Sequence, residues 1–432
     1  MNLYSTKNKS VKYSLRDAVL RGLPEDNGLF MPDVLPKLPQ QFFNDLPFKS
    51  FAELSFDVAK NLIGDQIPEA DLKAIVYDAI NFEAPLIQLN EQTFILELFH
   101  GPTLAFKDFG ARFMSRLVSY YIKNETKKTT ILVATSGDTG SAVANGFYNV
   151  EGIDVVILYP SGKVSPLQEK QLTTLDKNIT AIEIMGTFDD CQHLVKQAFL
   201  DADLRNTLML SSANSINIAR LIPQSFYYFY AYAQLNENRP VIFSVPSGNF
   251  GNLTAGLFAK KMGLPVQCFI AATNQNKIVP DYLNKGTFEP KASVQTISNA
   301  MDVGNPSNFM RMLDFYSELE AMKNDVSGYA FTDDETKAEM RNIFQHFNYI
   351  TDPHCAVGLL GLQKYFAENK TTAKGIVLGT AHPAKFIEVV EDTLAINIEL
   401  PQQLAGVAAK TKNALLMATD FTALKSYLLS RN

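Results

Sequence analysis

Short runs of apolar residues alternate with stretches of helical periodicity along most of the chain after residue 92. Each run is continuous rather than alternating, which is typical of strands buried on both faces of a parallel sheet. The runs lie at Thr129–Ala134, Ile153–Tyr159, Ile179–Ile184, Val241–Val245, Val266–Ala272 and Gly375–Leu378. The pattern predicts an α/β fold in which mostly parallel strands are covered by helices on both sides.

The first ninety residues have a different pattern. An opening strand and helix are followed by a proline-rich stretch that predicts an extended connector, with Pro32, Pro36, Pro39 and Pro47. Helical periodicity returns at Phe51–Ile63 and Leu72–Ile80. We therefore expect a small N-terminal domain over residues 1–90, a main domain over 91–400 and a helical tail over 401–432.

One helix has a start that can be predicted from the sequence. Thr187 can accept a hydrogen bond from the backbone of Asp190, and Asp190 can return one, as in a capping box. The residues that follow have core spacing on one helical face, namely Cys191, Leu194, Val195 and Ala198.

The composition excludes several kinds of partner. The 432 residues are 46% hydrophobic and 19% charged, as in a globular protein. The net charge of −6 gives no general attraction for nucleic acid or acidic membranes, so we expect neither as a partner. The most apolar run, Phe226–Ala233, is far shorter than the roughly 20 residues that span a bilayer. Because the N-terminus also lacks the apolar core of a signal peptide, we expect a cytoplasmic protein.

Some common cofactor sites are also excluded. The cysteines, Cys191, Cys268 and Cys355, are odd in number and far apart, which excludes a disulfide framework and paired-cysteine zinc motifs. The histidines form no H-x-x-x-H pair, so no metal is expected. The nucleotide motifs G-x-G-x-x-G and G-x-x-x-x-G-K-[ST] are absent. Candidate chemistry therefore lies in the loops at the carboxyl ends of the strands, where such sheets bind ligands.

The loop after the strand Val241–Val245 is the first candidate. It reads Ser247-Gly-Asn-Phe-Gly-Asn252 and leads into a helix predicted at Leu253–Met262. Gly248 and Gly251 would let the backbone turn tightly, so that several N–H groups converge beside a helix N-terminus. That arrangement binds phosphate without a cation. An ordinary strand-to-helix turn would have the same residues, and the loop alone does not distinguish the two.

Lys107 is the second candidate. It lies between Phe106 and Phe109 in an apolar stretch. Loss of hydration lowers the pKa of a lysine amine and makes it nucleophilic, so that it can form a Schiff base with an aldehyde. A surface lysine at a helix start, paired with Asp108, is the alternative.

Three further segments carry polar groups. The turn Thr135–Gly140 offers hydroxyls and amides that suit a carboxylate, although a simple helix cap would have the same residues. The segment Ser211–Arg220 ends in an arginine that could clamp an anion or form a structural ion pair. After the last predicted strand, Thr380 could offer a neutral hydroxyl to a ring nitrogen, and His382 is read as structural.

These segments together resemble the fold-type II enzymes that use pyridoxal 5′-phosphate, the tryptophan-synthase-β-like group, and within it the long bacterial and fungal threonine synthases. The resemblance covers nearly the whole chain and is weakest at residues 36–90 and beyond 400. It rests on HGPTLAFKDFGARFM (100–114), ATSGDTGSAVA (134–144), LYPSGKVSPLQEKQ (158–171), SANSINIARL (212–221), VPSGNFGNLTAGL (245–257), NAMDVGNPSN (299–308) and GTAHPAKF (379–386). It implies two doubly wound, mostly parallel sheet lobes plus a small N-terminal domain.

The resemblance also implies roles for particular residues. Lys107 is similar to the lysine that holds the cofactor, and Thr380 to the residue that faces its pyridine nitrogen. The cofactor's phosphate would be bound by the amides of Gly248, Asn249, Phe250, Gly251 and Asn252. The substrate's α-carboxylate would be held by Ser136, Gly137, Asp138 and Thr139, with Asp138 also near the ring hydroxyl. The substrate's own phosphate would be bound by Asn214, Ser215, Arg220 and Lys163.

The activity that the resemblance implies is conversion of O-phospho-L-homoserine and water to L-threonine and phosphate. A serine or threonine dehydratase, or a phospho-lyase, would keep Lys107 and the 247–252 loop but would not need Arg220 for a substrate phosphate. A metabolite-binding protein without catalysis is a rival of a different class. We expect a monomer or a homodimer.

Overall fold

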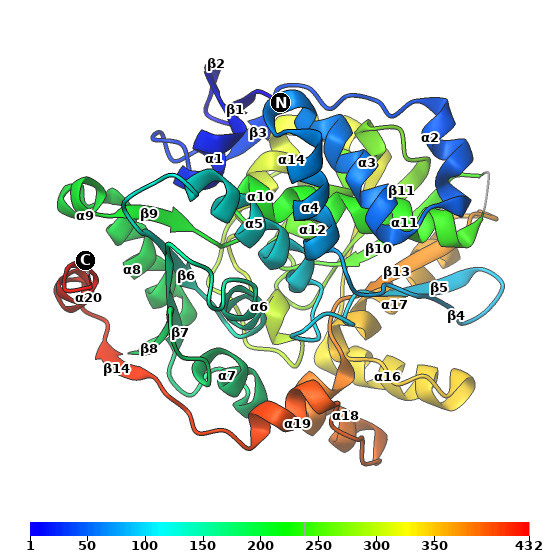
Figure 1. Cartoon of the computed structure of the whole chain (residues 1–432). Helices are drawn as coiled ribbons and strands as arrows, with labels where there is room; N and C mark the ends of the chain where they lie inside the picture. Colours follow the sequence, from blue (N-terminus) through cyan, green and yellow to red (C-terminus); the bar gives the residue numbers. More distant parts are fainter. Residues whose placement is uncertain (237–238, 432) are drawn as a thin grey trace.

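Within the described residues, the strands form three sheets (Figure 1). The computed structural model describes residues 1–236 and 239–431. The smallest sheet is antiparallel and lies at the N-terminus, where β1 (Leu3–Ser5) pairs with both β2 (Asn8–Tyr13) and β3 (Phe30–Pro32). The helices and short 3₁₀ turns of this region are α1 (Leu15–Arg21), α2 (Gln40–Asp45), η1 (Leu46–Phe48), α3 (Phe51–Ile63), η2 (Gly64–Gln66) and α4 (Glu69–Ala79).

The two larger sheets are mostly parallel. In spatial order the six-stranded sheet contains β12 (Val326–Ala330), β11 (Val266–Thr273), β10 (Val241–Pro246), β13 (Gly375–Gly379), β5 (Thr93–Glu97) and β4 (Leu86–Gln88). Only β4 runs antiparallel to its neighbour. The five-stranded sheet contains β14 (Leu415–Ala418), β8 (Ile179–Met185), β7 (Ile153–Pro160), β6 (Thr129–Ala134) and β9 (Met209–Ser212), all parallel.

Helices cover these sheets. The helix α17 (Pro353–Glu368) contacts β10, β11 and β13, and α8 (Phe188–Leu200) contacts β6 and β7. The others are α5 (Lys107–Ile122), α6 (Asp138–Gly146), α7 (Pro166–Thr173), α9 (Ala202–Thr207), α10 (Ile218–Leu221), η3 (Ile222–Ser225), α11 (Phe226–Leu235), α12 (Gly251–Lys261), α13 (Ile278–Lys285), η4 (Asn299–Met301), α14 (Phe309–Phe315), α15 (Leu319–Asp325), α16 (Asp333–Phe347), η5 (Pro383–Phe386), α18 (Ile387–Leu394), α19 (Gln402–Ala408) and α20 (Phe421–Leu429).

The predicted α/β fold is confirmed, and its six predicted strands are present as β6, β7, β8, β10, β11 and β13. Every residue of β6, β10 and β13 is buried, which explains why these strands are continuously apolar. The predicted capping box of Thr187 and Asp190 is also present at the start of α8. In the part of the chain that the structure describes, no helix has the length and apolar character needed to cross a membrane.

The C-terminal tail differs from the prediction of a purely helical segment. It contains the strand β14, which extends the five-stranded sheet beside β8. On either side of it, α19 contacts α7, and α20 contacts α8 and α9, so the tail follows one side of the molecule (Figure 1, red). Leu424 and Leu428 of α20 are buried in the same hydrophobic cluster as α8.

Candidate active site

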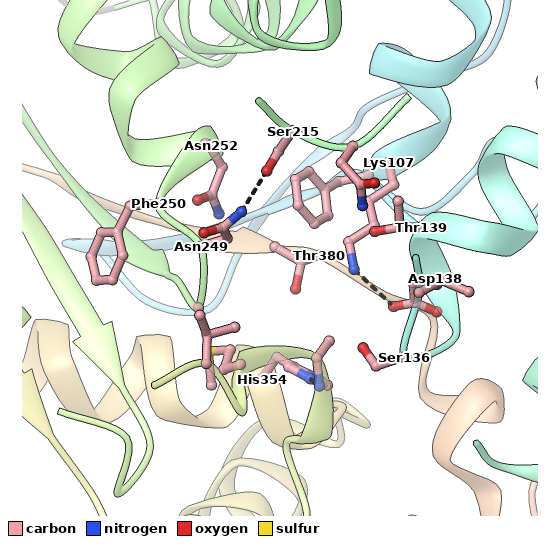
Figure 2. Close-up of a pocket in the computed structure, with 18 of the residues that line it drawn as sticks. Lys107, Ser136, Asp138, Thr139, Ser215, Asn249, Phe250, Asn252, His354 and Thr380 are labelled. Carbon is pink, nitrogen blue, oxygen red and sulfur yellow. Dashed lines mark hydrogen bonds and ion pairs between the residues drawn. The ribbon is translucent and has the colours of Figure 1, made fainter. Parts of the chain in front are cut away.

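The loops that follow β6, β9, β10 and β13 meet around one cavity (Figure 2). Carboxyl ends of parallel strands gather at one edge of a sheet, so these loops converge although they are far apart in the sequence. The predicted site residues that line the cavity are Lys107, Ser136, Asp138, Thr139, Asn214, Ser215, Arg220, Gly248, Asn249, Phe250, Gly251, Asn252 and Thr380. Two predicted residues lie outside this lining: Gly137 and Lys163.

Lys107 is the first residue of α5, and its neighbours are anchored to the loop after β13. The backbone N–H of Phe106 donates a 2.9 Å hydrogen bond to the carbonyl of Thr380, and Ala105 pairs with Ala381 as an isolated bridge. This places the Lys107 side chain in the cavity, where it is only 15% exposed. Asp108 is not its partner, because that buried carboxylate accepts hydrogen bonds from the N–H and the hydroxyl of Thr103.

Asp138 is the charged group that faces Lys107. Its Oδ2 lies 3.9 Å from Lys107 Nζ, as the dashed line in Figure 2 shows. Burial lowers the pKa of the Lys107 amine, and the carboxylate of Asp138 partly offsets that effect. For Asp138 itself, burial raises the pKa of the carboxyl, but Lys385 and Lys107 outweigh burial and hold it well below its usual range. The pair therefore combines a carboxylate that is ionised at neutral pH with an amine that loses its proton more readily than a free lysine does.

The loop from Gly248 to Asn252 carries unpaired N–H groups. None of its five backbone N–H groups donates to an acceptor within residues 1–236 and 239–431. These N–H groups lie at the N-terminus of α12, where the helix dipole stabilises a negative charge. The side chain of Asn252 holds the loop in shape by donating to the carbonyl of Pro246 and accepting from the hydroxyl of Ser247. The geometry matches that of an anion site.

The glycines of this loop have a different function from the predicted one. The residue with a left-handed conformation is Phe250, at φ 59°, and neither Gly248 nor Gly251 has positive φ. Gly248 is required by close packing instead, because a Cβ there would lie 2.7 Å from the Cα of Met301. The loop is therefore packed directly against η4, whose Met301 also lines the cavity.

The turn after β6 does not form the simple helix cap by Ser136 or Thr139 that was the alternative to a carboxylate site. The helix α6 begins at Asp138, within the predicted turn, and neither Ser136 nor Thr139 caps it. The hydroxyl of Thr135 accepts hydrogen bonds from the N–H groups of Gly137 and Gly140 instead. Gly137 has φ 138° and packs against Gln168, which leaves Ser136 and Thr139 in the lining of the cavity.

Arg220 is buried at the side of the cavity. Its guanidinium donates to the carbonyl of Ala213 and, at 3.5 Å, to the carbonyl of Lys107, whereas its Nε has no hydrogen-bond partner. Burial lowers its pKa to about 10, so the group is still charged at neutral pH. Nε is buried against Gly110, so it is the positive charge of a guanidinium in the lining of the cavity that fits an anionic ligand.

The remaining predicted residues have varied positions. The side-chain amide of Asn214 accepts a hydrogen bond from the N–H of Ala134 and donates one to its carbonyl, so it fixes the end of β6. The hydroxyl of Ser215 accepts a hydrogen bond from Asn308. Thr380 lies in the cavity between the 249–252 loop and Lys107 (Figure 2). Lys163 is exposed. Among the described residues, no cluster of three or more His, Cys, Asp or Glu side chains could hold a metal ion.

Several residues at the site were not predicted. His354, at the start of α17, lines the cavity with a buried ring that accepts from the N–H of Ala300 and contacts Asp352 at 2.7 Å. Gln168 and Lys385 lie behind the cavity and contact Asp138. Both Gln168 and Lys385 belong to the motifs quoted above, but nothing in the local pattern distinguishes them from surface residues.

The residues of the cavity fit pyridoxal 5′-phosphate, the cofactor that the resemblance implies. The aldehyde needs a lysine amine with a lowered pKa, which Lys107 provides. The phosphate needs several unpaired N–H donors, and the loop from Gly248 to Asn252 provides them. The pyridine nitrogen needs a polar neighbour, and Thr380 lies between these two features.

Comparisons with known proteins agree along the full chain. Residues 2–80 match the family described as threonine synthase N terminus, 81–379 the pyridoxal-phosphate dependent enzymes, and 355–428 the threonine synthase C-terminal family. A threonine synthase of Haemophilus influenzae is 46% identical over 431 residues, which cover 99% of this chain and 100% of that protein.

Solved structures give the same result. The crystal structure of threonine synthase from Escherichia coli has a TM-score of 0.93 and 44% identity, and the match covers 100% of both chains. The structure of threonine synthase from Brucella melitensis with bound pyridoxal phosphate also has a TM-score of 0.93, with 36% identity, and the match covers 99% of this chain and 98% of that one. The fold and the full-length similarity agree, and the chain belongs to the threonine synthase family of pyridoxal-phosphate-dependent enzymes.

Proposed function

We propose that this enzyme converts O-phospho-L-homoserine and water to L-threonine and inorganic phosphate, with pyridoxal 5′-phosphate held at Lys107. The observation that supports this most directly is the placement of two unlike features in one cavity. The amine of Lys107 and the unpaired N–H groups of the loop from Gly248 to Asn252 both face it. An aldehyde and a phosphate on one small molecule would contact both.

Lys107 is the candidate for proton transfer. When bound, the cofactor withdraws electrons from the substrate and makes its carbon-bound protons easier to remove. Lys107 can accept and return such protons because its pKa is lowered by burial. The carboxylate of Asp138 stabilises the ammonium that forms each time Lys107 takes up a proton.

The substrate's phosphate needs a second anion site in the same cavity. Arg220 is the candidate, because it lines the cavity and its guanidinium stays charged when buried. Ser215 is close to both the 249–252 loop and Asn308, and its hydroxyl can add a further contact. Ser136 and Thr139 would hold the α-carboxylate from the N-terminus of α6.

A serine or threonine dehydratase, or a phospho-lyase of the same fold type, is the closest alternative. Such an enzyme would also use Lys107 and the loop from Gly248 to Asn252, but it would not need the charge of Arg220 in the cavity for a substrate phosphate. A protein that only binds metabolites would not need a lysine with a lowered pKa.

Turnover decides between these functions. The purified enzyme is supplied with O-phospho-L-homoserine, and phosphate release and threonine formation are measured together. Serine and threonine are offered separately as control substrates. We expect equal amounts of phosphate and threonine from O-phospho-L-homoserine and a far lower rate with the controls. Failure to turn over O-phospho-L-homoserine would reject the proposed function.

The cellular setting is also part of the proposal. The three cysteines are free and buried, which suits a reducing cytoplasm. Burial raises the pKa of the Cys191 thiol to about 12, so it does not react readily. We keep the expectation of a monomer or a homodimer, which light scattering on the purified enzyme would resolve.

A further inference from the structure

A buried lysine outside the cavity contacts the carboxylate that faces Lys107. Lys385 belongs to η5, shortly after Thr380, and its side chain is 0% exposed. Its Nζ lies 2.8 Å from Asp138 Oδ1 and donates a 2.8 Å hydrogen bond to the carbonyl of Thr103. A buried ammonium is strongly unfavourable without such partners, so this position is specific.

The two oxygens of Asp138 have different surroundings. Oδ1 is bound by Lys385 and also accepts a 2.8 Å hydrogen bond from the amide of Gln168. Oδ2 is the oxygen nearest to Lys107, at 3.9 Å from its Nζ. With Oδ1 fully occupied, the carboxylate cannot rotate freely, and Oδ2 stays directed at the amine.

We propose that Lys385 is a positioning residue for the amine of Lys107: it holds Asp138 with Oδ2 toward that amine and supplies a fixed positive charge behind the carboxylate. The proposal rests on the proposed function in one respect, namely that Lys107 is the amine to which pyridoxal 5′-phosphate binds. Lys385 itself is not among the residues that line the cavity.

Charged groups on three elements act on Lys107, which itself begins α5. Beyond burial, Asp138 on α6 raises the pKa of the amine, whereas Lys385 on η5 and Arg220 on α10 lower it. Replacing Lys385 with a neutral residue removes one positive charge, so protonation of Lys107 becomes easier and its pKa rises. A higher pKa leaves less free amine at a given pH. The rate at which the amine reacts with an aldehyde should then begin to increase only at higher pH.

The test measures capture of pyridoxal 5′-phosphate by the full-length protein stripped of cofactor, as a function of pH. Lys385→Met removes the charge and keeps most of the side-chain volume. We expect the midpoint of the rise in capture rate to move up by about one pH unit relative to the wild type.

Gln168→Leu is the matched control, because it removes a neutral donor from Asp138 Oδ1 while Lys385 still holds that oxygen. It should leave the midpoint in place. An unchanged midpoint in Lys385→Met, or an equal shift in Gln168→Leu, would overturn the proposal. If the wild type captures the cofactor but does not turn over O-phospho-L-homoserine, the proposed function fails while the capture curves still test Lys385.

Lys385→Met leaves Asp138 buried without its nearest cation, and this variant can fail to fold. The double variant Lys385→Met/Asp138→Asn removes both charges. If Lys385→Met fails to fold or is unstable, a folded double variant with a higher Tm than Lys385→Met supports the ion pair between Lys385 and Asp138. A double variant no more stable than Lys385→Met alone would contradict it.

Discussion

The amide of Asn249 donates a 2.7 Å hydrogen bond to the hydroxyl of Ser215 (Figure 2). Asn249 follows β10 of the six-stranded sheet, and Ser215 follows β9 of the five-stranded sheet. This single contact therefore joins the two sheets across the cavity. The same hydroxyl accepts from Asn308, whose carbonyl oxygen accepts from the buried guanidinium of Arg311.

Ser215→Ala should therefore destabilise the enzyme and weaken cofactor binding. The substitution leaves the amide donors of Asn249 and Asn308 without their acceptor. We expect a loss of about 1–3 kcal/mol in the free energy of unfolding, measured by urea denaturation, and a higher Kd for pyridoxal 5′-phosphate. Ser10→Ala on the exposed strand β2 is the control, with an expected change within about 0.5 kcal/mol. Equal effects at the two positions would contradict the bridging function of Ser215.

Lys107→Ala should abolish both turnover and covalent retention of the cofactor. Because the same amine is proposed to hold the cofactor and to move protons, we expect kcat to fall at least about 10³-fold. Borohydride treatment should fix pyridoxal phosphate on Lys107 of the wild type and leave the variant unlabelled, as read by mass spectrometry. Lys163→Ala, which changes an exposed lysine outside the cavity, is the control and should keep full labelling. Full turnover by Lys107→Ala would exclude the proposed chemistry.

The strands could be predicted because burial on both faces leaves a strong local signal. The bounds of β6 match the apolar run Thr129–Ala134, and the other five predicted strands differ from theirs by one residue at one end. β14 is different, because its side chains are mostly exposed and it is ordered by pairing with β8, more than 200 residues away in the sequence. The sequence of the tail alone does not indicate that β8 has a free edge with which β14 can pair.

As with the strands, the parts of the candidate site that have a local sequence pattern could be predicted, and the parts that depend on distant residues could not. Glycine-rich turns and a lysine between phenylalanines leave local signals, and the structure brings these segments together. The partner of Asp138 left no such signal, because Lys385 is buried only through an ion pair with a residue 247 positions away. The left-handed conformation of Phe250 could not be predicted from the sequence either, because glycine is the residue that usually adopts it and two glycines lie nearby.

Arg220→Lys should impair recognition of phosphate. Lysine keeps the charge but lacks the planar set of donors by which the guanidinium is held against the carbonyls of Ala213 and Lys107. We expect inorganic phosphate to inhibit the wild type competitively and its inhibition constant to rise about tenfold in the variant, or about 1.4 kcal/mol. Arg205→Lys, at an exposed position on α9, should leave inhibition unchanged. Unaltered inhibition by phosphate in Arg220→Lys would place the substrate's phosphate elsewhere.

Asp138→Asn should shift the pH dependence in the direction opposite to Lys385→Met. The carboxylate of Asp138 raises the pKa of Lys107, so its removal lowers that pKa and provides free amine at lower pH. The midpoint of the cofactor-capture curve should move down by about one unit. The variant should also be less stable by about 3–5 kcal/mol near pH 7, because Lys385 is left buried without its carboxylate.

The stability difference in Asp138→Asn should shrink on acidification. The pKa of Asp138 is held below its unfolded value, so its contribution to stability is complete at pH values above the unfolded pKa of about 3.9 and is lost as pH falls through the folded pKa. Urea denaturation from pH 7 downward measures this, and a difference that grows in acid would show that Asp138 is not held as an ion. Asp281→Asn, which alters a surface ion pair, is the control.

The tail offers a test of whether α20 is part of the core. Leu424 is 0% exposed in the cluster beneath α8, whereas Leu416 of β14, in the same tail, is 63% exposed. Leu424→Ala should lower the free energy of unfolding by about 2–4 kcal/mol, because it removes buried surface and leaves a cavity. Leu416→Ala should cost less than about 0.5 kcal/mol. Because the cluster also holds β6 and β7, the Leu424→Ala protein should lose its cofactor at a lower temperature than the control, as followed by visible absorption during heating. Equal stability of the two variants would mean that α20 packs on the sheet domain without stabilising it.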